Sequence, residues 1–92
     1  MQRSDISSLR IGDWLIIEDR RYEIVYILPE AEPVDGELLD VLTIALHSGK
    51  SLALEPTDFL RFYPERELLI FEHHDRRIRT ELEDIDVEKR KS

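Results

Sequence analysis

The sequence contains no cysteine, and it has three glycines and one tryptophan among its 92 residues. Without cysteine there is no disulfide, which excludes a small secreted scaffold held by disulfides and fits a reducing compartment. No apolar run approaches the roughly 20 residues that a membrane-spanning helix needs. No long apolar stretch follows the polar start of the chain, so we expect no signal peptide. These absences predict a cytoplasmic protein with no membrane partner.

Hydrophobic residues make up 41% of the chain, which is enough for one compact core, and charged residues make up 37%. A chain of this length buries about 60–65% of its unfolded surface, so we expect one small domain. Acidic residues outnumber basic residues by 21 to 13, which gives a net charge of -8. Proteins that bind nucleic acid gain affinity from Lys and Arg contacts with phosphates. The net charge therefore disfavours a nucleic-acid partner.

Residues 9–28 have the pattern of two β-strands joined by a tight turn. Trp14–Ile17 is a short apolar run, and its tryptophan and isoleucines favour a strand. The polar residues 18–21 form a connection of hairpin length. Tyr22–Leu28 follows as a second strand with apolar residues on both faces. We expect Pro29 to end this strand, because proline cannot donate to a β-ladder.

The middle of the chain alternates between turn signals and short strand candidates. Residues 29–37 contain two prolines and one glycine, and we expect them to form an acidic loop. Strands are then predicted at residues 38–47, 51–54 and 60–63. Pro64 follows the last of these and should end it.

The segment after Pro64 has two competing interpretations. Residues 67–73 form an apolar strand candidate, residues 74–76 a turn, and residues 77–83 alternate, which together favour a β-hairpin. A helix over residues 76–88 is the alternative, because the charged residues there are good helix formers. The alternation in residues 77–83 makes the hairpin the preferred prediction.

These patterns predict a mostly β chain, built as a small SH3-like five-stranded barrel with an added C-terminal β-hairpin or short helix. Residues 1–8 should be a flexible lead-in or one turn of helix. Residues 9–83 should form the single barrel domain, with the C-terminal extension starting at about residue 65. Residues 84–92 should be a charged tail, since such termini are usually poorly ordered.

No catalytic, cofactor or metal site is predicted. His73, His74 and Asp75 have the residue types of a metal site, but adjacent residues on a strand point to opposite faces. A zinc site also needs three or four converging ligands. The serines that flank Gly49 near His47 are turn residues, and no phosphate-loop, dinucleotide or G-x-S-x-G motif occurs. The sequence therefore does not indicate an enzyme.

Two groups of residues are candidates for partner binding. The acidic loop carries several carboxylates with no basic residue between them, which favours a partner with a basic surface; Pro33 and Val34 break the spacing of a calcium loop. The second group has the composition of a basic and aromatic patch for single-stranded nucleic acid. It contains Trp14, the arginines of the first turn and the arginines at positions 76, 77 and 79. The candidate residues are Glu30, Glu32, Asp35, Glu37, Arg20, Arg21 and Trp14.

The segment from Leu9 to Tyr63 resembles the N-terminal SH3-like barrel of elongation factor P and its eukaryotic and archaeal relatives. The matching stretches are residues 9–13, 14–18, 21–25, 48–50 and 56–59. The resemblance implies a barrel associated with the ribosome. In that family the loop after the second strand carries a modified basic residue, whereas residues 29–37 have no lysine or arginine. The same pattern also fits SH3-like adaptors of phage and bacterial assemblies, so we carry over the barrel and not the activity.

We therefore expect a non-enzymatic protein-interaction or structural module that needs no cofactor and binds another protein. One alternative is a nucleic-acid or ribosome-associated SH3-like barrel. A second alternative is an accessory subunit of an enzyme or of a phage or bacterial assembly. The sequence leaves open the identity of the partner, the biological process, whether the chain forms a homo-oligomer, and which aromatic side chains are exposed.

Overall fold

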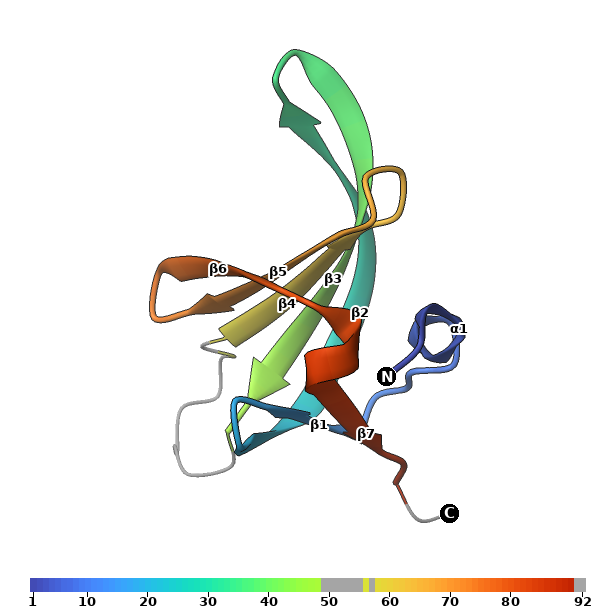
Figure 1. Cartoon of the computed structure of the whole chain (residues 1–92), viewed down its shortest axis with the longest axis vertical. Helices are drawn as coiled ribbons and strands as arrows, with labels where there is room; N and C mark the ends of the chain where they lie inside the picture. The colour runs from blue at the N-terminus through green and yellow to red at the C-terminus, as the bar shows by residue number, and fades with distance from the viewer. Residues whose placement is uncertain (49–55, 57, 91–92) are drawn as a thin grey trace.

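The chain forms a single antiparallel sheet of seven strands across the residues that the computed structural model describes, which are 1–48, 56 and 58–90. The strand order is β6-β5-β4-β3-β2-β1-β7 (Figure 1). The strands are β1 (Trp14–Ile17), β2 (Arg20–Val34), β3 (Glu37–His47), β4 (Asp58–Tyr63), β5 (Leu68–His73), β6 (Arg76–Thr80) and β7 (Ile85–Glu88). A short helix, α1 (Arg3–Ile6), precedes the sheet, and the 3-10 helix η1 (Leu82–Asp84) connects its two edge strands.

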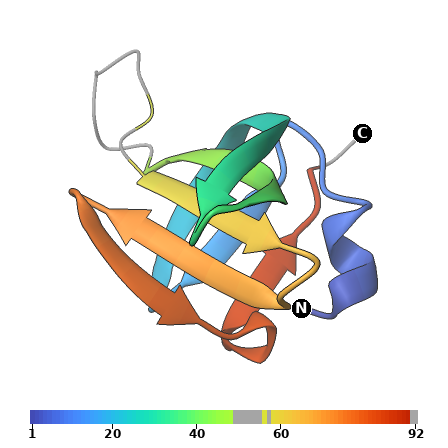
Figure 2. The ribbon, with the colours of Figure 1, turned by 90° about the horizontal axis from the view of Figure 1, so that it is seen from above.

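The sheet curls on itself, so that the edge strands β6 and β7 are joined by the short η1 connection (Figure 2). Tyr22 of β2 and Phe71 of β5 meet edge to face across the interior, with ring centroids 5.6 Å apart. The mostly β, barrel-like prediction is confirmed, with 62% of the described residues in strands. The prediction of five strands is not confirmed, because the described residues contribute seven to the sheet.

The main core lies on the inner face of the curled sheet. Its completely buried aliphatic side chains come from β1, β2, β3, β4 and β7, and each contributes about 1.5–3 kcal/mol relative to an exposed side chain. These residues are Leu15, Ile17, Ile24, Ile44, Leu46, Leu60 and Ile85. A β-bulge between Ile24 and Tyr26 shifts the register of β2 against β3. The bulge keeps both Ile24 and Ile27 on the inner face, which simple alternation would not allow.

The prediction of an acidic loop at residues 29–37 is wrong, because β2 continues to Val34. β2 ends at Val34 and β3 begins at Glu37, so that the turn contains two residues, Asp35 and Gly36. Both have positive φ angles, 50° and 80°, which is the backbone of a tight hairpin turn of type I′. The acidic residues therefore lie along a long β-hairpin.

Pro29 and Pro33 fit inside β2 because of the edge that they occupy. They pair with Leu42 and Leu38 of β3, and their spacing places both nitrogens on the same side of the strand. The ladder between β1 and β2 ends at Glu23, so the far side of β2 has no strand partner at the prolines among the described residues. A proline here costs no ladder hydrogen bond, and its missing N–H discourages another strand from adding to this edge.

The C-terminal segment forms the predicted hairpin, and the helix alternative is wrong. β5 and β6 pair antiparallel from Leu69–Thr80 to His73–Arg76. The hairpin is part of the main sheet rather than an appended unit, since β5 also pairs with β4 along its whole length. The strand expected at residues 60–63 begins at Asp58, and the one expected at 51–54 lies outside the described residues.

The structure differs from the sequence-based boundary at the C-terminal end of the domain, and at the N-terminal end it contains the single helical turn that the sequence left as an alternative. The tail expected from residue 84 contains β7, which pairs with β1 and buries Ile85 completely. The lead-in contains the single helical turn α1, whose Ile6 packs into the main core. No helix in the described part of the chain has the length and apolar character required to cross a membrane.

One buried carboxylate ties the segment before β1 to the segment after β7. Asp13, which is 2% exposed, accepts hydrogen bonds from the backbone N–H groups of Arg10 and Arg90, each at 2.9 Å. The ammonium group of Lys89 lies 3.3 Å from the same carboxylate. Burial acts to raise the pKa of Asp13, but these donors outweigh it and hold the pKa below its usual value.

We predict that Asp13→Ala lowers the free energy of unfolding by about 2–3 kcal/mol, because two backbone donors lose a charged acceptor. Since folding lowers the pKa of Asp13, its contribution is complete above the ordinary carboxyl range and is lost as the pH falls through the folded-state pKa. The difference between wild type and variant should therefore shrink below about pH 4. Urea denaturation between pH 3 and pH 7 measures it. Asp86→Ala, at an exposed position of β7, is the control and should change stability by less than about 0.5 kcal/mol.

Candidate functional site

A second apolar cluster lies on the outer face of the sheet, which turns away from the main core. Leu39, Val41 and Tyr63 are buried there, and Val34, Leu68 and Ile70 are partly buried against them. In β5, Leu68 and Ile70 alternate with the core residues Leu69 and Phe71, so this strand is apolar on both faces. The outer face is covered in part by the far end of the β2–β3 hairpin, which extends beyond the other strands (Figure 1).

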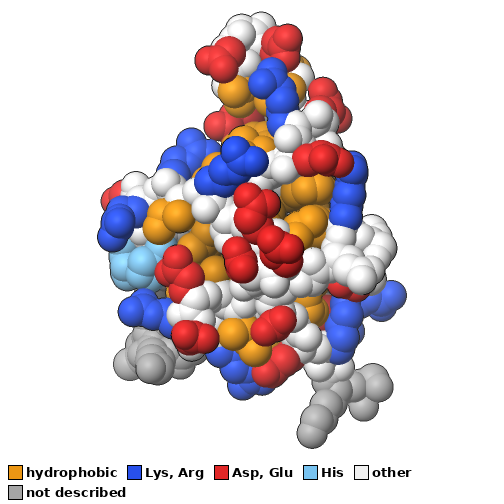
Figure 3. Space-filling view, viewed as in Figure 1, with side chains coloured by type: hydrophobic (Ala, Val, Ile, Leu, Met, Phe, Trp, Pro, Cys, Tyr) orange, Lys and Arg blue, Asp and Glu red, His pale blue; other side chains and the backbone are white. Residues whose placement is uncertain are grey.

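Two adjoining hollows run along this face between the hairpin and strands β4 to β6. One, of about 620 Å³, has an apolar floor formed by the second cluster. The other, of about 560 Å³, is lined by the edge of β2 and by charged side chains of β4, β5 and β6. They share Glu32, Pro33 and Arg77, and we call them together the hairpin groove. Apolar side chains are visible at the base of the projecting hairpin, with acidic and basic side chains beside them (Figure 3).

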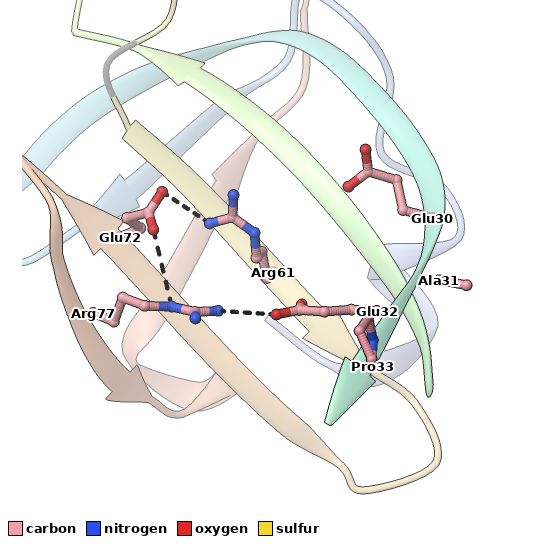
Figure 4. Close-up of a pocket in the computed structure, with 7 residues that line it drawn as sticks. All are labelled: Glu30, Ala31, Glu32, Pro33, Arg61, Glu72 and Arg77. Atoms are coloured by element: carbon pink, nitrogen blue, oxygen red, sulfur yellow. Dashed lines mark hydrogen bonds and ion pairs between the residues drawn. The ribbon is translucent and has the colours of Figure 1, made fainter. Parts of the chain in front are cut away.

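A chain of ionic contacts crosses the groove from β5 to β2 (Figure 4). Arg61 pairs with Glu72 at 2.9 Å. The guanidinium of Arg77 lies 3.9 Å from Glu72 and 4.0 Å from Glu32. The contact between Arg77 and Glu32 joins β6 to β2, which are not neighbours in the sheet, whereas the two contacts of Glu72 lie between neighbouring strands.

Tyr63 anchors the hairpin from below. Its hydroxyl donates to Glu32 at 2.6 Å and accepts from Arg77 at 3.2 Å. Burial, together with the hydrogen bond to the Glu32 carboxylate, raises the pKa of the Tyr63 phenol. The phenol therefore stays protonated and acts as a donor, so that β2, β4 and β6 meet at one side chain.

The acidic residues singled out in the sequence are distributed over both strands of the hairpin. Glu30 and Glu32 line the groove. Glu37, at the start of β3, pairs with Arg66 at 2.9 Å, and Asp35 lies in the turn at the rim of the larger hollow. Two of the four carboxylates thus have an arginine of the same chain within 4.0 Å.

The basic and aromatic residues singled out in the sequence lie apart from the acidic ones in the structure. Arg20, Arg21 and Trp14 lie at the β1–β2 hairpin, where the Arg21 guanidinium stacks 4.0 Å from the centre of the Trp14 ring. Arg21 also pairs with Glu88 at 2.9 Å. The arginines that the sequence grouped with them are placed elsewhere, since Arg77 and Arg79 line the hairpin groove.

A histidine pair was correctly noticed, but its geometry differs from the expectation. His73 ends β5 and its Nδ1 lies 2.9 Å from the Asp58 carboxylate, which is 1% exposed. His74 stands in the turn with a φ of 48°, so that its ring meets the ring of His73 at 4.1 Å instead of pointing to the opposite face. Within the described ranges, no three His, Cys, Asp or Glu side chains gather as metal ligands.

We predict that Tyr63→Phe lowers the free energy of unfolding by about 1–2 kcal/mol, because Glu32 loses its hydroxyl donor while the buried ring is kept. Thermal or urea denaturation measures the change. Tyr26→Phe, on the same face but 38% exposed, is the matched control and should be neutral. Equal effects of the two substitutions would show that Tyr63 does not anchor the hairpin.

No protein-family model matches the chain, and neither a curated protein nor a solved structure matches it. The curled, all-β sheet is compatible with an SH3-like barrel, but no relative links it to elongation factor P.

Proposed function

We propose that this protein is a non-enzymatic interaction module that holds an extended segment of another protein in the hairpin groove. The observation that carries the proposal is the apolar cluster on the outer face, which gives the groove a floor beneath a charged rim. Val34, Leu68 and Ile70 remain partly exposed on this floor. Apolar pockets with a few convergent polar groups are the usual form of a binding site.

The groove favours side-chain contacts over strand addition. The unpaired edge of β2 contains Pro29 and Pro33, which offer no N–H to an incoming strand. An extended segment would instead lie over the outer face, where alternate side chains reach the floor about every 6.6 Å. In this proposal the floor gives affinity and the charged rim gives specificity.

The fold proposed for the module is an SH3-like barrel enlarged by additional strands, with the resemblance to elongation factor P confined to that barrel. The nucleic-acid alternative has weaker support, because Arg21 and Arg77 already face carboxylates of the same chain. The cytoplasmic location expected from the cysteine-free sequence is part of the proposal.

Selection from a displayed peptide library against the folded chain tests the proposal. We expect enriched peptides to shift the amide resonances of Val34, Leu68 and Ile70 in a ¹H–¹⁵N spectrum. Ile70→Thr should weaken binding about fivefold to 30-fold, since a floor contact worth about 1–2 kcal/mol is lost.

Ile11→Thr is the matched control, because Ile11 is 56% exposed and lies outside the groove. Its affinity for the same peptides should equal that of wild type. Failure to enrich any peptide, or resonance shifts confined to other surfaces, would falsify the proposed use of the groove.

A further inference from the structure

Two carboxylates stand side by side on the groove wall. Glu30 and Glu32 are two residues apart in β2, so they share the outer face at a spacing of about 6.6 Å. Thr43 donates its hydroxyl to Oε2 of Glu30 at 2.7 Å, and Tyr63 donates to Oε2 of Glu32 at 2.6 Å. Both donors are 3% exposed. Each carboxylate is thereby oriented by a buried neutral hydroxyl through one oxygen, which leaves the other oxygen as an acceptor.

The cation nearest to this pair is held loosely. Arg77 makes one hydrogen bond, to Tyr63 at 3.2 Å, and its ion-pair distances to Glu32 and Glu72 are 4.0 and 3.9 Å. Arg61 pairs with Glu72 at 2.9 Å, which is the usual length of a charge-assisted hydrogen bond. The Arg77 side chain is also 48% exposed. Arg77 is therefore held beside these carboxylates by electrostatic attraction rather than by a fixed, bidentate ion pair.

The charge of this hollow is not balanced. Its lining holds the carboxylates of Glu30, Glu32 and Glu72 against the guanidinium groups of Arg61 and Arg77. Glu30 accepts its hydrogen bond from Thr43. Among the described residues it has no ion pair within 4.0 Å, and Figure 4 shows no contact from Glu30 to the other residues of the hollow. One further cation at Glu30 would neutralise the hollow.

We propose that Glu30 and Glu32 form the binding position for an arginine side chain of the partner segment, and that Arg77 is an internal stand-in which this arginine displaces from Glu32. The proposal rests on the function proposed above and adds the chemistry of the partner. Guanidinium suits the site better than ammonium, because its planar donors can reach two acceptors at once. The apolar floor lies beyond Glu32 along β2, so the segment should also carry a large aliphatic residue two to four positions from the arginine.

The test uses the whole chain and two blocked peptides, acetyl-Gly-Arg-Thr-Leu-Gly-amide and the same peptide with neutral citrulline in place of arginine. Titration is followed in ¹H–¹⁵N spectra at low salt. The arginine peptide should bind about threefold to tenfold more tightly than the citrulline peptide. Glu30→Gln should reduce this ratio to about one, whereas Arg77→Gln should raise the affinity for the arginine peptide about threefold.

Two controls match these substitutions in charge. Glu83→Gln removes an exposed carboxylate outside the hollow, and Arg76→Gln removes an exposed guanidinium next to Arg77 on the opposite face of β6. Both should leave the ratio unchanged. If both peptides shift the resonances of the groove residues equally, the proposed arginine-binding position is wrong, while the peptide groove is supported. If neither peptide shifts the resonances of the groove residues, the proposal that the groove binds this class of segment is wrong as well.

Discussion

The buried carboxylate of Asp13 joins the segment before β1 to the segment after β7, at the edge of the sheet where these two strands pair. It holds the backbone N–H groups of Arg10 and Arg90, so that the segments flanking β1 and β7 are fixed beside each other. The next hydrogen bonds follow from that position, because Gly12 donates to the Ile24 carbonyl and Ile24 donates to the Asp13 carbonyl, each at 2.9 Å. Gly12 has a φ of 96°, and an added Cβ would lie 3.1 Å from the Arg90 side chain. Gly12 and Asp13 thus fix the β1–β7 edge of the sheet through backbone geometry and one buried charge.

The parts of the fold that local chemistry determines could be predicted from the sequence. The strand Trp14–Ile17 was predicted from its residue types, and the hairpin of β5 and β6 from the alternation of residues 77–83 after a turn. Two elements could not be predicted, because they depend on distant partners. Pro29 ends a strand only if its nitrogen faces a neighbouring strand, and here it faces an edge that has no strand partner within the described part of the chain. β7 has two apolar residues among charged ones, and it becomes a strand by burying Ile85 beside β1.

The charged residues of the candidate site could be predicted from the sequence, but its apolar floor could not. Glu30 and Glu32 were recognised as acidic residues without basic neighbours in the sequence, and both line the groove. Residues 67–73 were predicted as an apolar strand, but the sequence alone does not tell which distant strand lies over its second face. Arg77 was assigned to a basic patch because sequence distance hides its position opposite Glu32 across the sheet.

The edge of β2 explains why recognition should depend on side chains. A free edge normally offers alternating N–H and C=O groups to an incoming strand. In the outer part of β2, Ile27, Pro29, Ala31 and Pro33 point their backbone groups toward that edge, and the two prolines remove half of the donors. The same prolines let the hairpin continue past the barrel, because its ladder to β3 uses the intervening residues. The hairpin therefore forms one wall of the groove, and its edge resists strand addition. The specificity of the groove then depends on the carboxylates and arginines that face it.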